Sequence, residues 1–403
     1  LTELEGLMKP FRPHDSPALP VFHGGAVGYL AYDMVRFFEP TLSPPPKDEL
    51  GLPDMVFMVT DTVLVFDHRT RRLSIIANVH TDEHANLEAA YEWAKAQILA
   101  VMSKLERPLA AKPLQAFAPL SKEQLPTPSG NTTREEYEGM VLKMKEYIAA
   151  GDIFQGVPSQ RFETAYSGST IDLFRALRHV NPSPYMFCLD FPQGFALVGS
   201  SPEVHVKCMD GRIDIRPIAG TRWRGKTQAE DDALADELLH DPKERAEHIM
   251  LVDLARNDVG RVAEYGSVRV SDLMIVERYS HVMHIVSNVD GRLRPEKTAY
   301  DVMRATFPAG TVSGSPKVRA MEIINECEKS KRCAYAGAVG YFGADGSVDT
   351  CIVLRTALLK DGTMCVQAGG GVVADSDPDA EYDETLHKSN ALRRAAAEAW
   401  RFG

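Results

Sequence analysis

The sequence predicts an α+β protein in which helices pack around antiparallel β-sheets. Apolar, β-branched runs and helical patterns are mixed along the chain, without the regular strand–helix alternation that is typical of a parallel sheet. The segment 334–374 indicates antiparallel pairing most directly, because Asp345-Gly346 and Asp361-Gly362 separate its apolar runs and are hairpin turn signals. We therefore expect a meander of hairpins here, with helices covering the sheets.

The composition excludes several classes of protein. The chain has 403 residues, of which 44% are hydrophobic and 25% charged, which is typical of a folded protein with a large core. A net charge of -11 without any basic run disfavours binding to nucleic acid or to an anionic membrane. The six cysteines form no CxxC pair, and no apolar stretch approaches the roughly 18–20 residues of a membrane helix. We expect a reduced, cytoplasmic protein.

Three segments differ in pattern. Residues 1–106 form a β-rich N-terminal portion, residues 107–130 a connecting segment rich in proline, and residues 131–403 the region that carries the chemistry. Within the first, the apolar runs 56–67 and 72–80 predict a hairpin, and a helix is expected around 83–105.

Helix boundary signals are clear in the middle of the chain. Thr133 and Glu136 resemble a capping box and open a helix that ends at Gly151. Asp241-Pro242 fits an N-cap followed by proline at the first helical position, so a new helix starts there. The remaining expected elements are a helix at 227–240, strands at 184–199, 204–217, 267–276 and 282–289, helices at 297–306 and from 317 to about 327, and a closing helix from Asp377-Pro378 to about 400.

Two Glu-x-x-Glu pairs are the strongest chemical signal. Glu244 with Glu247, and Glu381 with Glu384, each lie on one face of an expected helix. One such pair alone is most often a solvated helix face. Here the first precedes a mostly apolar run, and the second follows a glycine-rich loop at a helix N-terminus, where anions are favoured. Four converging carboxylates would need a hard cation, and Mg²⁺ prefers such oxygen ligands.

Two glycine-rich loops and several single residues have both structural and functional interpretations. The loops 310–314 and 369–371 either are ordinary turns or offer backbone N–H groups to an anion; neither has the spacing of a nucleotide-binding loop. Arg355, expected in mid-strand, either pairs with a structural carboxylate or clamps a ligand carboxylate. Glu203 is a surface residue or a general acid, and His281 and His284 are structural unless one of them is an acid/base group.

Taken together, these motifs resemble the chorismate-binding enzymes, and among them the anthranilate synthase component I group. The resemblance covers nearly the whole chain and is carried by RPIAGTRWRG (216–225), DPKERAEHIMLVDLARNDVGR (241–261), VERYSHVMHIVSNV (276–289), FPAGTVSGSPKVRAMEII (307–324) and QAGGGVVADSDPDAEYDETLHKSNAL (367–392). It implies a Mg²⁺-dependent conversion of chorismate and ammonia to anthranilate and pyruvate in tryptophan biosynthesis. A separate glutamine amidotransferase subunit, component II, would supply ammonia from glutamine.

The same resemblance implies roles for individual residues. Glu203 matches the general acid and His284 the histidine of the pyruvate-releasing step, while Gln155 and Lys388 are further catalytic positions. The substrate-binding positions are Thr221, Thr311, Tyr335, Arg355, Gly369, Gly370 and Gly371, and the Mg²⁺ positions are Glu244, Glu247, Glu381 and Glu384.

Two positions separate the branches of this family. Related enzymes that add water carry a lysine where this chain has Gln155, because water needs a base to become nucleophilic and ammonia does not. Aminodeoxychorismate synthases usually carry a lysine, thought to act covalently, where this chain has Ala219. Both positions favour anthranilate formation.

A tryptophan pocket is implied at Pro184, Tyr185, Met186 and Cys351. The Leu-Leu-Glu-Ser motif that helps family members bind inhibitory tryptophan does not occur in this sequence, so we expect weakened inhibition. An alternative of another class is a non-catalytic homologue that acts as a tryptophan-responsive or scaffold subunit. Product fluorescence formed from chorismate with and without EDTA would separate the two.

Overall fold

The computed structural model describes residues 1–11, 13, 16, 18–108, 125, 128–279 and 282–402. Its helices are α1 (Thr2–Met8), α2 (Leu87–Leu105), α3 (Arg134–Ala150), α4 (Thr170–Val180), α5 (Gln228–His240), α6 (Pro242–Gly260), α7 (Ala299–Thr306), α8 (Lys317–Cys327) and α9 (Pro378–Glu398). Short 3-10 turns lie at Tyr32–Phe37, Thr81–Glu83, Gly310–Val312 and Ala399–Arg401.

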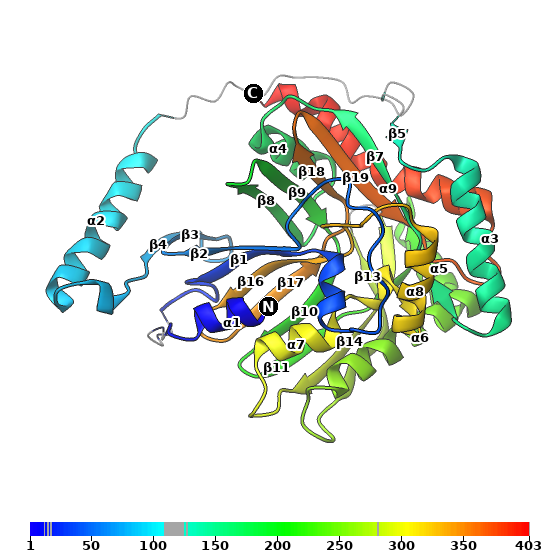
Figure 1. Ribbon diagram of the computed structural model, residues 1–403, viewed down its shortest axis with the longest axis horizontal. Coiled ribbons are helices and arrows are strands. Elements are labelled where there is room, and N and C mark those ends of the chain that lie inside the picture. Colours follow the sequence, from blue (N-terminus) through cyan, green and yellow to red (C-terminus); the bar gives the residue numbers. More distant parts are fainter. Residues whose placement is uncertain are drawn as a thin grey trace.

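Two large antiparallel sheets contain most of the strands (Figure 1). The nine-stranded sheet contains β1 (Gly25–Leu30), β2 (Met55–Thr60), β10 (Val204–Met209), β11 (Arg212–Ile215), β12 (Ile218–Trp223), β13 (Arg269–Arg278), β14 (Val282–Arg292), β16 (Ala338–Gly343) and β17 (Val348–Ile352). The six-stranded sheet contains β5 (Ser129–Gly130), β7 (Ser159–Ala165), β8 (Tyr185–Phe191), β9 (Phe195–Ser201), β18 (Thr356–Lys360) and β19 (Thr363–Gly369). Two small ribbons pair β3 (Thr62–Asp67) with β4 (Arg72–Ala77), and β6 (Gln155–Gly156) with β15 (Gly314–Ser315).

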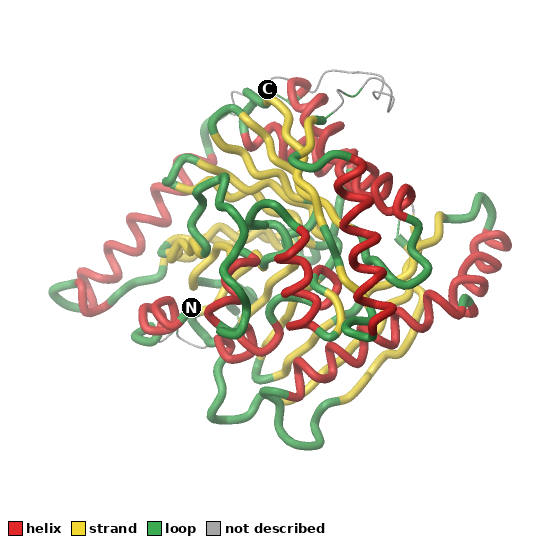
Figure 2. Tube along the Cα trace, turned by 45° about the vertical axis from the view of Figure 1, so that its right-hand side comes forward, coloured by secondary structure: helices red, strands yellow, loops and turns green. Residues whose placement is uncertain are grey.

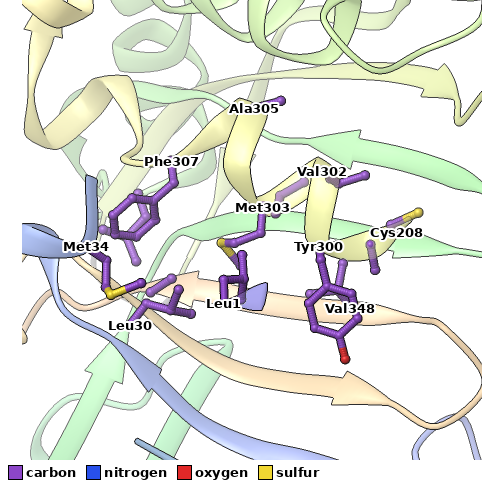
Figure 3. Close-up of a cluster of buried hydrophobic side chains, with 14 of the residues drawn as sticks. Leu1, Leu30, Met34, Cys208, Tyr300, Val302, Met303, Ala305, Phe307 and Val348 are labelled. Carbon is purple, nitrogen blue, oxygen red and sulfur yellow. The ribbon is translucent and has the colours of Figure 1, made fainter. Parts of the chain in front are cut away.

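The sheets stack face to face, and helices cover their outer faces (Figure 2). Strand periodicity builds these layers, because successive side chains point to opposite faces. On β9, Leu197 faces the core between the sheets, whereas Val198 faces the core beneath α4 and α9. On β16, Val339 faces the inter-sheet core and Phe342 faces the core beneath α6 and α7, part of which is shown in Figure 3. The predicted α+β class is confirmed.

The helix boundaries predicted from capping residues are confirmed. Thr133 and Glu136 form a complete capping box at the start of α3, and Gly151 ends that helix in the left-handed region, at φ 84°. The Asp241 side chain accepts hydrogen bonds from two backbone N–H groups of α6. The Asp377 side chain caps α9 by accepting one hydrogen bond, from the Ala380 N–H.

Several apolar runs predicted as single strands are divided in the structure. Residues 56–67 form β2 and β3, which lie in different sheets, so only β3 pairs in the expected hairpin with β4. The runs 184–199 and 204–217 each form two strands. The expected meander 334–374 is wrong as one unit, because β16 and β17 join one sheet and β18 and β19 the other. An apolar run cannot by itself reveal where a chain leaves one sheet for the next.

Two such crossings lie side by side. The chain passes from β9 to β10 through Glu203, and from β17 to β18 through Arg355. Because β9 pairs with β18 and β10 pairs with β17, both crossings sit at one junction of the two sheets. The prediction that Arg355 lies in mid-strand is therefore wrong. Arg355 lies in the linker between two strands.

The N-terminal portion is continuous with the rest of the structure. Strand β1 pairs with β16, and Leu4 and Leu30 pack in the same core as residues of α6 and α7. Most of the connecting segment 107–130 lies outside the described residues. The domain boundaries at 106 and 131 stay a prediction. No helix among the described residues combines the length and apolar character needed to span a membrane.

Candidate active site

The junction of the two sheets places a carboxyl group beside a guanidinium. The Glu203 backbone carbonyl accepts a hydrogen bond from the Ile352 N–H at 3.0 Å, and the Arg355 carbonyl accepts one from Ser200 at 3.1 Å. Each bond therefore ties one linker to the strand that precedes the other linker, β17 or β9. Arg355 adopts φ 47°, an uncommon conformation for a residue other than glycine and a form of backbone strain that often marks a functional site.

Glu203 is positioned to remain protonated near neutral pH. Its side chain is buried, and this burial raises the pKa of its carboxyl group to about 8, despite opposing effects of Thr311, Lys388 and Arg355. Glu203 and Thr311 line a small cavity, together with residues of α6 and the 310–312 turn. A neutral carboxyl group facing a cavity can donate a proton to a leaving group.

Burial also lowers the pKa of Arg355. Among the described residues, the acidic group that opposes this effect is Glu203. Because Glu203 is mostly neutral at pH 7, it does not neutralise this guanidinium. Arg355 is therefore available to an anionic ligand, as one of the two interpretations of the sequence proposed.

The four glutamates of the Glu-x-x-Glu pairs converge. Burial raises the pKa of Glu247, and the nearby carboxylates of Glu244 and Glu384 raise it further. Burial likewise raises the pKa of Glu381, with an added effect of Glu384. Gln155, at the start of β6, donates from Nε2 to Glu247 Oε1 at 3.1 Å. The two acidic helices, α6 and α9, thus present their carboxylates to one another.

Gly369, Gly370 and Gly371 let these side chains approach the backbone. A Cβ atom on Gly370 would lie 2.4 Å from Glu381 Oε2, and one on Gly371 would lie 2.5 Å from Gln155 Nε2. A Cβ on Gly369 would lie 3.0 Å from the Tyr335 hydroxyl. The glycine loop is therefore required for close approach rather than for a left-handed turn.

Gly370→Ala should therefore disturb the site while sparing the fold. The added methyl group displaces the Glu381 carboxylate, and we expect activity to fall by at least about tenfold, with thermal stability nearly unchanged. Gly139→Ala on α3 is the matched control: nothing lies within 4 Å of its added Cβ, so it should keep full activity and gain about 1 kcal/mol of stability. Equal activities of the two variants would contradict this role of the loop.

His284 joins the acidic cluster to the sheet junction. Its Nδ1 lies 2.9 Å from the Gly220 carbonyl and 3.1 Å from the Thr221 hydroxyl. Burial lowers the pKa of His284, and the charge of Arg355 lowers it further, so a neutral ring is favoured at pH 7. Gly220 in turn leaves room for Glu244.

Lys388 and Tyr335 complete the arrangement. The Lys388 ammonium group donates to the Gly369 carbonyl at 2.8 Å and pairs with Glu384 at 2.6 Å. Tyr335 is buried with its hydroxyl next to Gly369, and burial raises its pKa. The predicted catalytic, substrate and metal positions are thus linked by contacts or charge effects into one cluster.

The implied tryptophan positions are only partly brought together. Tyr185 donates to Asp349 Oδ1 at 2.8 Å and packs with Cys351 in the inter-sheet core, next to Pro184 in the chain. The Met186 side chain lies on the opposite face of β8, in the core beneath α4 and α9. His281 lies outside the described residues.

Reasoning from the sequence missed several residues that support the site. Arg222 on β12 donates to Glu244, Asp241 and Glu237 at 3.0–3.1 Å, and so clamps the start of α6. It stands within the quoted motif RPIAGTRWRG, but an arginine at a strand edge gives no signal of its partners. The buried pair Glu328 and Arg332 was also missed, because no spacing pattern in the sequence connects it to its partners.

The acidic cluster fits a hard cation, although no group of three or more His, Cys, Asp or Glu side chains within the described residues is arranged as a ready-made metal site. Two of the four carboxylates are engaged with cations, Glu244 with Arg222 and Glu384 with Lys388. Glu381 Oε2, in contrast, is buried without a hydrogen-bond partner. Such an orphaned oxygen and the carboxylate of Glu247 suit Mg²⁺, which typically takes one or two carboxylates directly.

Comparison with known proteins identifies relatives of this chain. Residues 3–394 match the family model of the chorismate binding enzymes. The chain is 49% identical to anthranilate synthase component 1 of Pseudomonas putida, over 99% of this chain and 80% of that protein. The crystal structure of anthranilate synthase component I from Streptococcus pneumoniae matches with a TM-score of 0.86 and 40% identity, over 97% of this chain and 85% of that one. The menaquinone-specific isochorismate synthase of Escherichia coli shares the fold, with a TM-score of 0.66 and 18% identity, over 98% and 99% of the two chains.

The fold is therefore that of the chorismate-utilising enzymes. The chain belongs to the chorismate-binding enzyme family, and within it the chain is similar to component I of anthranilate synthase.

Proposed function

We propose that this chain is an anthranilate synthase component I, which converts chorismate and ammonia to anthranilate and pyruvate in tryptophan biosynthesis. The observation that carries the proposal is the junction at which a neutral, buried Glu203 lies beside Arg355 and within the influence of Lys388. Relatives with this name, almost half identical over nearly the whole chain, support the same reaction.

The residues have distinct roles in this proposal. Chorismate carries two carboxylates, and Arg355 binds one of them together with the Tyr335 hydroxyl and the Gly369 backbone. Glu203, with its pKa raised to about 8, donates a proton to the C4 hydroxyl as it leaves. Neutral His284, held through Nδ1, keeps its other ring nitrogen for proton transfer during pyruvate release.

Glu247 and Glu381, with Glu244 and Glu384 directly or through water, would hold Mg²⁺. The ion would bind the ring carboxylate and neutralise its charge among the glutamates. Arg222 and Lys388 balance the charge of Glu244 and Glu384.

Ammonia is the proposed nucleophile at ring C2. It needs no general base, and the amide of Gln155 supplies none. Ala219, on β12 opposite Ile285, likewise provides no amine for covalent chemistry. A glutamine amidotransferase partner, component II, would deliver ammonia in the cell.

The test is an assay of the purified chain with chorismate, ammonium and Mg²⁺, in which anthranilate is followed by its fluorescence and identified by chromatography. We expect anthranilate and pyruvate in equal amounts, loss of the signal with EDTA, and recovery on adding excess Mg²⁺. Isochorismate or aminodeoxychorismate as the product would refute the assignment. Binding of chorismate without any product would favour the non-catalytic alternative.

A further inference from the structure

A buried ion pair lies behind the site. Glu328 and Arg332 follow α8, and their side chains are only 5% and 1% exposed. Arg332 Nε lies 2.9 Å from one Glu328 oxygen, and Arg332 NH2 lies 2.6 Å from the other, a two-pronged contact. The guanidinium also lies over the ring of Tyr32, 4.6 Å from its centroid, and 5.7 Å from that of Tyr335.

This pair has further contacts with two separate segments, 157–159 and the turn that contains Val312. Arg332 donates to the backbone carbonyls of Val312 at 2.7 Å and Val157 at 2.5 Å. Glu328 Oε1 accepts from both the N–H and the hydroxyl of Ser159, at 2.8 Å each. These contacts join chain segments that are 20 to 175 residues apart in sequence.

Each contacted segment carries a residue of the candidate site. Val312 follows Thr311, and Val157 lies two residues after Gln155. Ser159 is the register partner of Gly369 on β19. Tyr335 packs on Arg332 directly.

We propose that Arg332 and Glu328 are positioning residues, which fix the relative placement of Gln155, Thr311 and Tyr335 and, through the strand that pairs with Ser159, of Gly369. The inference rests on the proposed function. A buried ion pair is weak evidence of stability, because its desolvation offsets much of its attraction. Its geometry, however, holds several backbone segments in fixed positions at once. Binding groups that are already in place lose less conformational entropy when a ligand binds.

The test compares Arg332→Lys and Ser159→Ala with the wild type in steady-state kinetics with chorismate. Lysine keeps the charge but cannot reach all the acceptors of the planar guanidinium. We expect Arg332→Lys to raise KM for chorismate roughly tenfold, with kcat within about threefold, because binding is lost equally in the ground and transition states. Ser159→Ala removes the hydroxyl that donates to Glu328 and accepts from Gln367 Nε2, and it should raise KM by about threefold.

Tyr32→Phe is the matched control. It keeps the ring that packs on the same guanidinium and removes a buried hydroxyl that has no hydrogen-bond partner, so KM should stay unchanged. A purely structural role of Arg332 would lower the amount of active enzyme, which reduces the maximal rate without moving KM. That result, or an unchanged KM in a folded Arg332→Lys variant, would overturn the inference.

If circular dichroism shows that Arg332→Lys is unfolded, Ser159→Ala decides, and an unchanged KM in that variant overturns the inference. A wild-type chain that makes no anthranilate refutes the proposed function instead. The two failures are therefore distinguishable.

Discussion

Glu203→Gln is expected to lower kcat for anthranilate formation by about 10²–10⁴-fold, because the amide cannot donate the proton that the leaving hydroxyl needs. The substitution preserves the size and burial of the side chain. Loss of rate with an unchanged circular dichroism spectrum would locate the effect in the chemistry. Kinetics at saturating chorismate measure it.

The pH profile gives an independent signature of the same group. The pKa of Glu203 is raised to about 8, so the acid form predominates at pH 7 and is lost as the pH rises through about 8. If this acid form is required, kcat/KM should fall about tenfold per pH unit above that value. The small residual rate of Glu203→Gln should lack this alkaline limb.

Stability should respond to the same titration. In the unfolded chain the carboxyl has a pKa near its ordinary value of 4.5, and in the folded chain it is raised to about 8. Between these values the folded state holds a proton that the unfolded state has lost. The contribution of Glu203 to stability is thus full below about pH 4.5 and is lost as the pH rises to about 8. Denaturant unfolding of the wild type should show this decline, and in Glu203→Gln it should be smaller, because other carboxyl groups with a raised pKa, such as those of Glu247 and Glu381, still contribute.

Glu163→Gln, a carboxylate-to-amide change on the partly exposed end of β7, is the matched control and should keep its activity and both profiles. A Glu203→Gln variant that retains more than a tenth of the wild-type kcat would exclude Glu203 as the general acid.

The local parts of the fold could be predicted because their causes are local. The capping residues Thr133, Asp241 and Asp377 act within four residues of themselves, and each starts the helix that it predicts. The Asp361-Gly362 turn, with φ of 49° and 74°, joins β18 to β19 as expected of a tight hairpin.

The division of strands between sheets could not be predicted, because it depends on contacts far away in sequence. The run around Arg355 is continuous in hydrophobicity, yet β17 pairs with β10 and β18 with β9. The same crossing creates the candidate site. The sequence does show Arg355 as a charged residue within an apolar run. It does not show that this residue lies in the linker between two strands.

The candidate site residues could be picked out from the sequence, whereas the residues that hold them in place could not. Glu247 and Glu381 stand in motifs that can be recognised by spacing, and the structure brings them to the same glycine loop. Arg222 and Arg332 act through partners that no spacing rule connects to them. Arg332, for example, donates to a carbonyl 175 residues away.

Glu381→Gln is expected to weaken binding of a divalent ion by roughly 100-fold, because it removes a charged ligand from the proposed Mg²⁺ site. The orphaned, buried Oε2 of Glu381 is the atom that suits the ion best. Mn²⁺ can stand in for Mg²⁺, and its binding to the chain can be measured by electron paramagnetic resonance without any turnover. Anthranilate formation by the variant should then require a correspondingly higher Mg²⁺ concentration.

Asp379→Asn provides the control on the same helix turn. It removes the same charge only two residues away, but this carboxylate is 72% exposed and pairs with Arg134 on α3. Its Mn²⁺ affinity should stay within about twofold of the wild type, because a solvent-screened charge outside the cluster contributes little. Equal Mn²⁺ affinities of Glu381→Gln and the wild type would show that the ion is bound elsewhere. The proposal that α6 and α9 bind the substrate through this ion would then be wrong.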